Sequence, residues 1–162
     1  MKVVLNQDVK EAPEIQLQKE GSNENAKENV KKSIQIIMNY PKKSGVPKCL
    51  RITYNNQYVM QVSMNMSVSF SGRNYDIPLK FIFPAEFPNI RPQIFVELFP
   101  GTGINAKNTD INTQNGYITT PTLARWSSGN TIYPVLDEID ASFQRSFPIY
   151  KIKPGQQQQP NI

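Results

Sequence analysis

The feature that most constrains this chain is an alternation of apolar and polar residues over 58–70. Successive side chains of an extended strand point to opposite faces, so this alternation gives one apolar face and one polar face. The apolar positions are Met60, Val62, Met64, Met66, Val68 and Phe70. The stretch therefore predicts a half-buried antiparallel strand.

Further strands follow this one in the sequence. Ser71-Gly72-Arg73-Asn74 predicts a turn, and the alternation then resumes over residues 75–83 as a second strand. Prolines next interrupt pairing, because proline has no N–H to donate, and residues 93–98 read as a third strand. With a short strand at 50–54, the sequence predicts a four-stranded antiparallel meander.

Two helices are predicted to flank this meander. The first runs from Ser22 or Asn23 to Tyr40, and Asn130 or Thr131 caps the second. Their apolar stripes are Ala26, Val30, Ile34 and Ile37 in the first helix, and Ile132, Leu136, Ile139 and Phe143 in the second. The acidic residues Asp137, Glu138 and Asp140 are expected to face water. Helix, meander, loop and helix make an α+β fold.

The segments between and outside these elements are predicted to be irregular. Residues 41–47, Pro-Lys-Lys-Ser-Gly-Val-Pro, read as a connector, and residues 99–116 as a long covering loop. Residues 1–22 are too polar to offset the entropy cost of ordering, so we expect a flexible arm in which 1–5 could add a short strand. One domain should span 23–152, followed by a low-complexity Gln/Pro tail at 153–162.

Composition removes several function classes. The chain has 162 residues, no histidine and one cysteine, Cys49, which excludes an internal disulfide, a zinc site and any mechanism with a histidine base. The net charge of +5 is spread along the chain without interleaved aromatics, so we expect no nucleic-acid binding. The sequence also lacks a long apolar run, so we expect neither a signal peptide nor membrane insertion. No metal or cofactor is expected.

Two motifs occur in a fixed order, one before the last strand of the meander and one after it. The first is Phe87-Pro88-Asn89-Ile90-Arg91-Pro92, and the second is Asn115-Gly116-Tyr117-Ile118-Thr119, which continues to Leu123 and Trp126. This order resembles the ubiquitin-conjugating fold, in which a proline turn, Asn-Gly-x-Ile, the active cysteine, a Leu and a Trp follow one another. The resemblance covers about residues 25–152 and implies that fold.

The position of the active cysteine is held by Thr119. A thioester requires a thiolate, which a threonine lacks, and the chain has none of the family's histidine. Cys49 lies far away in sequence and is interpreted as a small buried thiol. The chain therefore resembles a ubiquitin-conjugating enzyme variant, or UEV domain, and is expected not to be an enzyme.

Within that family, Tyr-Asp-Ile-Pro at 75–78 and Phe-Pro-Ile-Tyr at 147–150 are similar to segments of the UEV domain of the ESCRT-I tumour-susceptibility subunit. The resemblance implies a groove for Pro-Thr/Ser-Ala-Pro peptides. The corresponding positions are Asn65, Phe70, Tyr75, Thr102, Pro148, Ile149, Tyr150 and Lys151. A proline-rich ligand is already extended and suits slots between aromatic rings. The alternative is that the aromatic residues are simply core.

The resemblance also implies a ubiquitin-binding surface on the first hairpin tip and the sheet. The corresponding positions are Asn55, Asn56, Ile82 and Phe95. Ile82 falls off the alternation of Phe81 and Phe83, so it should point toward solvent or a partner, unless the first helix or the arm covers it.

The leading hypothesis is a catalytically inactive adaptor that binds proline-containing motifs, and weakly ubiquitin, in ESCRT-I-type sorting. This implies a cytoplasmic, endosome-associated protein that works through avidity with other subunits. Two alternatives stay open. One is a structural subunit that uses the fold as a scaffold, and the other is an accessory partner of an active conjugating enzyme.

Overall fold

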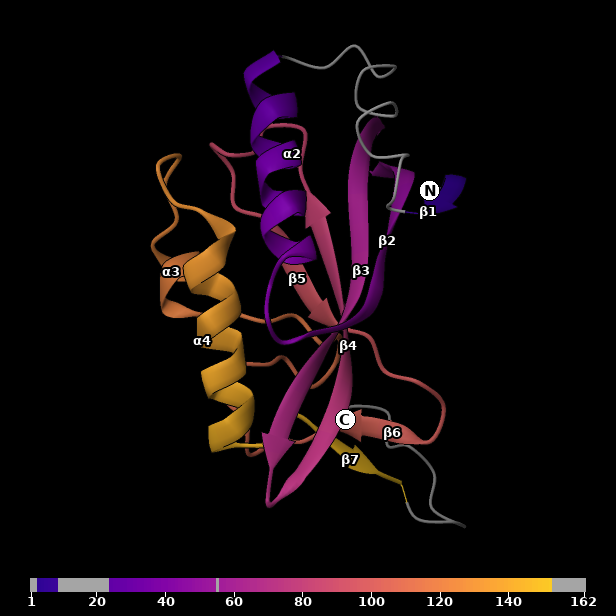
Figure 1. The fold of residues 1–162 in the computed structure, drawn as a ribbon, viewed down its shortest axis with the longest axis vertical. Coiled ribbons are helices and arrows are strands. Elements are labelled where there is room, and N and C mark those ends of the chain that lie inside the picture. Colours follow the sequence, from indigo (N-terminus) through magenta and orange to yellow (C-terminus); the bar gives the residue numbers. More distant parts are fainter. Residues whose placement is uncertain (1–2, 9–23, 55, 153–162) are drawn as a thin grey trace.

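A computed structural model describes residues 3–8, 24–54 and 56–152, which form an antiparallel sheet with two helices against one face (Figure 1). The sheet consists, in spatial order, of β1 (Val3–Asp8), β2 (Lys43–Tyr54), β3 (Gln57–Phe70), β4 (Arg73–Phe83) and β5 (Gln93–Val96). The predicted meander and the α+β class are therefore confirmed. Strand β1 adds a fifth strand at the edge, within the segment expected to be an arm. Residues 9–22 and the tail at 153–162 lie outside the described residues.

The helices α2 (Glu24–Met38) and α4 (Ile132–Arg145) cover the apolar face of the sheet, which we call the inner face. Their predicted stripes are confirmed wherever side chains are described. The buried members are Val30, Ile34 and Ile37 in α2, and Ile132, Leu136, Ile139 and Phe143 in α4. They pack on the inward row of β3, from Met60 to Val68. The alternation thus places the whole core on one side of the sheet.

The β3–β4 hairpin extends from Met60 opposite Phe83 to Phe70 opposite Arg73. Its two-residue turn, Ser71-Gly72, has φ values of 52° and 79°, the positive values that a twisted two-residue hairpin turn requires. Pro78 lies inside β4 without breaking a ladder bond. Its carbonyl accepts from the amide of Glu97, which follows β5, so the missing N–H points to the side where β5 has ended.

The prediction of a connector at 41–47 is wrong, because β2 already begins at Lys43. The register jumps from Ser44 opposite Asn65 to Lys48 opposite Ser63, so three residues of β2 face one residue of β3. Such a bulge lets a strand carry Gly45, whose φ is 76°, together with a proline. Gly and Pro therefore mark an irregular strand here.

Asp140 was predicted to face water, and the structure shows it buried at 7% exposure. Its carboxylate accepts from the Lys42 ammonium and from the Gln144 amide, which offsets the cost of burial. Beside it, the Tyr40 hydroxyl donates to Asp137 at 2.8 Å. Burial and that hydrogen bond raise the pKa of Tyr40 above its ordinary range. These contacts tie the end of α2 to α4.

The segment between β5 and α4 contains two short elements, β6 (Thr102–Ile104), within the predicted loop at 99–116, and α3 (Pro121–Ala124), after it. Strand β6 pairs with β7 (Ile149–Lys151), which follows α4 and closes a small second sheet. In the part of the chain that the structure describes, no helix has the length and apolarity needed to cross a membrane.

Candidate functional site

Three aromatic rings meet at the closed end of the β3–β4 hairpin. Phe70 and Tyr75 lie on the two strands next to the turn, and Phe147 reaches them from the segment after α4. The Phe147 ring centroid is 5.1 Å from that of Phe70 and 4.7 Å from that of Tyr75. All three side chains are half-buried, so each ring has one face in a contact and part of its surface open.

The chain after Phe147 continues this aromatic region. Tyr150 in β7 is 47% exposed, and its ring lies over Gly103 of β6. A Cβ at Gly103 would lie 2.8 Å from that ring, so a larger residue there would displace the ring. Ile149 is half-buried against the core, and Lys151 is exposed. We call Phe70, Tyr75, Phe147 and Tyr150 the hairpin-end aromatic surface.

Three of the predicted peptide-binding positions do not present side chains to this surface. Thr102 is 3% exposed, and its hydroxyl donates to the carbonyl of Phe99 and accepts from that residue's amide. Pro148 is buried, and its carbonyl accepts from the amide of Asn105. Asn65 is exposed, but it alternates with Met64 and Met66 and therefore lies on the opposite, outer face of the sheet.

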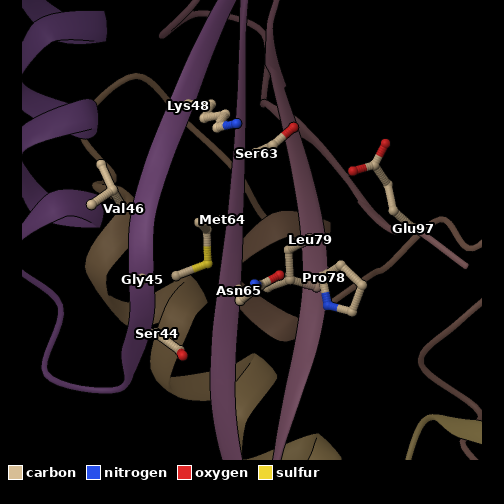
Figure 2. A pocket seen from close by; sticks show the side chains of 10 residues that line it. All are labelled: Ser44, Gly45, Val46, Lys48, Ser63, Met64, Asn65, Pro78, Leu79 and Glu97. Carbon is tan, nitrogen blue, oxygen red and sulfur yellow. The ribbon is translucent and has the colours of Figure 1, made fainter. Parts of the chain in front are cut away.

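Asn65 instead borders a cavity of about 180 Å³ at the bulge of β2 (Figure 2). The cavity spans three neighbouring strands of the outer face and the chain that follows β5. Its lining residues are Ser44, Gly45, Val46, Lys48, Ser63, Met64, Asn65, Pro78, Leu79 and Glu97. Figure 2 shows Lys48 reaching from β2 toward Ser63 on β3, with Glu97 beyond β4.

Two of the residues predicted to contact ubiquitin, Ile82 and Phe95, are also on the outer face. Asn56 is exposed at the hairpin tip, whereas Asn55 lies outside the described residues. Phe95 is half-buried, with the Tyr117 ring 5.4 Å away and the Lys80 ammonium 5.1 Å from its centroid. The Phe95 ring is therefore partly occupied by its own neighbours.

Ile82 requires a correction, because it was expected to point toward solvent or a partner. It does point away from the inner core, but it is only 6% exposed and packs in a second cluster with Ile52 and Val59. Helix α2 packs on the inner face and is not its cover. Of the arm at 1–22, the other cover considered, the structure describes Val3–Asp8, which is strand β1 at the edge of the sheet.

The segment that holds the active cysteine in conjugating enzymes is built into the fold by packing. Gly116 has φ 79°, and a Cβ there would lie 2.5 Å from the carbonyl oxygen of Val96. The Trp126 indole donates to the carbonyl of Pro88 at 2.7 Å, and Arg91 donates to that of Leu123 at 3.0 Å. These bonds join the two sequence motifs to each other.

No strong nucleophile stands in this segment. Thr119 is exposed, and its amide donates to the carbonyl of Asp110. Cys49 is buried in β2 on the inner face, and this burial raises the pKa of its thiol to about 12. In the described ranges, no group of three His, Cys, Asp or Glu side chains is arranged to hold a metal ion.

Residues 16–151 match the family described as the UEV domain. The chain belongs to the UEV domain family. The match spans most of the protein and includes both motifs that meet at Trp126. Comparison with curated protein sequences gave no significant match.

Two solved structures are similar to this UEV domain. One is the crystal structure of the yeast vps23 UEV domain in complex with a vps27 PSDP peptide, with a TM-score of 0.60 and 18% identity over 98% of this chain and 100% of that chain. The other is a complex of the Vps23 UEV with ubiquitin, with a TM-score of 0.55 and 20% identity over 81% and 92% of the two chains. At these identities the similarity establishes the fold.

Two members of the aromatic region were not predicted as site residues. Phe147 was interpreted only as part of an apolar knot, although it joins Phe70 to Tyr75. Gly103 makes room for the Tyr150 ring. An aromatic residue directly before a proline and a glycine in a short strand were the available signals, but neither identifies its contact partner in a single sequence.

Proposed function

We propose that this UEV domain is a non-catalytic adaptor that binds a proline-containing short peptide at the hairpin-end aromatic surface. The observation that carries the proposal is the packing of Phe147 on both Phe70 and Tyr75, with Tyr150 exposed on the strand that follows. Proline rings dock well between partly exposed aromatic rings, and an extended proline-rich ligand loses little entropy on binding. The solved vps23 UEV domain of the same fold has a PSDP peptide bound, which supports this ligand class.

The adaptor role extends to ESCRT-I-type sorting on endosomes, with the domain in the cytoplasm. Contacts of a four-residue motif with one small surface are weak, so such an adaptor relies on several linked sites. Thr119 and the buried Cys49 support the absence of conjugating activity. When incubated with ubiquitin, ATP and a ubiquitin-activating enzyme, the protein should form no thioester, and a thiol-sensitive ubiquitin adduct would contradict this part of the proposal.

The peptide site is tested by calorimetry with a Pro-Ser-Asp-Pro peptide and with a control peptide in which both prolines are alanine. Tyr150→Ala should weaken binding at least about fivefold, the usual consequence of removing an aromatic anchor. Tyr133→Ala is the matched control, because Tyr133 lies on α4 and is 44% exposed against 47% for Tyr150. Equal binding of both peptides, or equal losses in both variants, would contradict the site.

A second proposed ligand is ubiquitin, bound weakly on the outer face of the sheet near the β2–β3 hairpin tip. The exposed Asn56 and the half-buried Phe95 support it, and the Vps23 UEV of the same fold has been solved with ubiquitin. Titration of isotope-labelled domain with ubiquitin should shift the amide signals of Asn56 and Phe95. At about 1 mM ubiquitin, the titration detects a binding free energy of roughly −4 kcal/mol. Unchanged spectra at that concentration would contradict the proposed ubiquitin site.

A further inference from the structure

The cavity on the outer face exists because of the bulge in β2. Between Ser44 and Lys48 the strand carries three unpaired residues against the single residue Met64 of β3. The strand bends there, and a space of about 180 Å³ opens between β2 and the chain after β5. Ser63 and Asn65 alternate with the inward residues Met64 and Met66 and so lie on the outer face, whereas Phe70 and Tyr75 lie in the inward rows of β3 and β4.

Four polar side chains in the lining of this cavity can donate hydrogen bonds. They are the hydroxyls of Ser44 and Ser63, the side-chain amide of Asn65 and the ammonium of Lys48. Within the described ranges of the chain, none of these four side chains makes a hydrogen bond or ion pair. The cavity therefore offers donors whose partners have to come from a ligand or from water.

The charges around the cavity are mixed. Lys80 is the register neighbour of Ser63 on β4, and Asp8 is the register neighbour of Lys48 on β1. The one acidic side chain in the lining, Glu97, lies beyond β4 at the far side from Lys48 (Figure 2). Lys48 supplies the positive charge of the lining, on the side away from Glu97.

We propose that this cavity binds the carboxylate of an acidic residue in a partner polypeptide. A carboxylate only accepts hydrogen bonds, so it complements Lys48, Ser63 and Asn65 together. Val46 and Pro78 supply apolar walls for the chain on either side of the acidic residue. Glu97 repels further negative charge, which favours a single acidic side chain over a phosphate backbone with one charge per nucleotide.

The test is an amide NMR titration of the whole chain with the blocked peptide Gly-Ser-Asp-Ser-Gly and its isostere Gly-Ser-Asn-Ser-Gly. The Asp peptide should shift the amides of Ser63 and Asn65 and bind about three- to fivefold more tightly than the Asn peptide, the usual range for a partly exposed ion pair. Lys48→Gln should abolish that difference. Glu97→Gln should strengthen binding of the Asp peptide about twofold.

Lys107→Gln is the matched control, because Lys107 is exposed on the covering loop and its substitution changes the net charge by the same amount. Equal affinity of the two peptides, or an equal effect of Lys107→Gln and Lys48→Gln, would overturn the proposal. Shifts confined to residues outside the cavity would overturn it as well. A short oligothymidylate that shifts Ser63 and Asn65 more strongly than the Asp peptide would assign the cavity to nucleic acid instead.

Discussion

The segment from Asn115 to Trp126 and the hairpin-end aromatic surface both carry residues typical of the family, yet their side chains are used differently. In the first, Gly116 and Trp126 are tied to the backbone of Val96 and Pro88, and the amide of the exposed Thr119 donates to the carbonyl of Asp110. In the second, the aromatic rings contact one another and remain partly open. The first segment is therefore fixed by contacts with the backbone, whereas the second leaves aromatic surface that a ligand can reach.

The contrast between the two regions requires that the domain has no reactive thiol elsewhere. The alkylation rate of Cys49 tests this requirement and has the largest expected effect. Burial moves the pKa of Cys49 from its ordinary value of 9.0 to about 12, so the thiolate fraction at pH 8 falls by a factor on the order of 10³. Iodoacetamide should therefore label the native protein far more slowly than the protein in urea, as followed by mass spectrometry. Comparable rates would show an accessible thiol and weaken the distinction.

Gly116 tests whether the segment from Asn115 to Trp126 is held in place by close packing against the backbone. Gly116→Ala should lower the free energy of unfolding by about 2–4 kcal/mol, because its Cβ would meet the Val96 carbonyl oxygen at 2.5 Å in a left-handed conformation. Gly101→Ala is the matched control, since Gly101 has φ 84° and open space around it, and it should cost only about 1 kcal/mol. Urea unfolding of both variants gives the comparison, and equal costs would show that the close approach does not matter.

Much of the fold could be predicted because its signals are local. Alternation gave the inner face of β3 and β4, and helical spacing gave the buried stripes of α2 and α4. The bulge was missed because Gly45 and Pro47 look the same in a connector and in an irregular strand. The burial of Asp140 depends on Lys42, which is 98 residues away in sequence, and that of Ile82 depends on Ile52 and Val59 on other strands. Such partners are not visible in a local pattern.

The candidate site was predictable in its location more than in its contacts. Phe70, Tyr75 and Tyr150 were identified through the family resemblance. Phe70 and Tyr75 are half-buried and Tyr150 is exposed, so a ligand can reach all three. Thr102 and Asn65 were assigned by position alone. A turn hydrogen bond takes up the first, and strand parity puts the second on the outer face.

Trp126 provides a smaller test of the scaffold. Trp126→Phe keeps an aromatic ring against Phe87 but leaves the carbonyl of Pro88 without its indole donor. We expect a loss of about 1–2 kcal/mol in the free energy of unfolding, measured by urea denaturation. A cost below about 0.3 kcal/mol would show that the bond does not hold the two motifs together.

Tyr150→Ala has the smallest expected effect on stability. It tests whether the Tyr150 ring of the hairpin-end aromatic surface lies outside the core. Because 47% of its surface is exposed, Tyr150→Ala should alter the free energy of unfolding by no more than about 1 kcal/mol in the same urea assay. A loss near 3 kcal/mol, the value typical of a truncated core aromatic, would show that the ring is part of the core.

The most direct test of the account is an amide NMR titration of the labelled domain with a Pro-Ser-Asp-Pro peptide. The account predicts saturable shifts at Phe70, Tyr75 and the segment from Phe147 to Lys151, with the signals of Thr119 and its neighbours unchanged. Shifts centred on Thr119, or no shifts at millimolar peptide, would contradict the assignment of binding to the hairpin end.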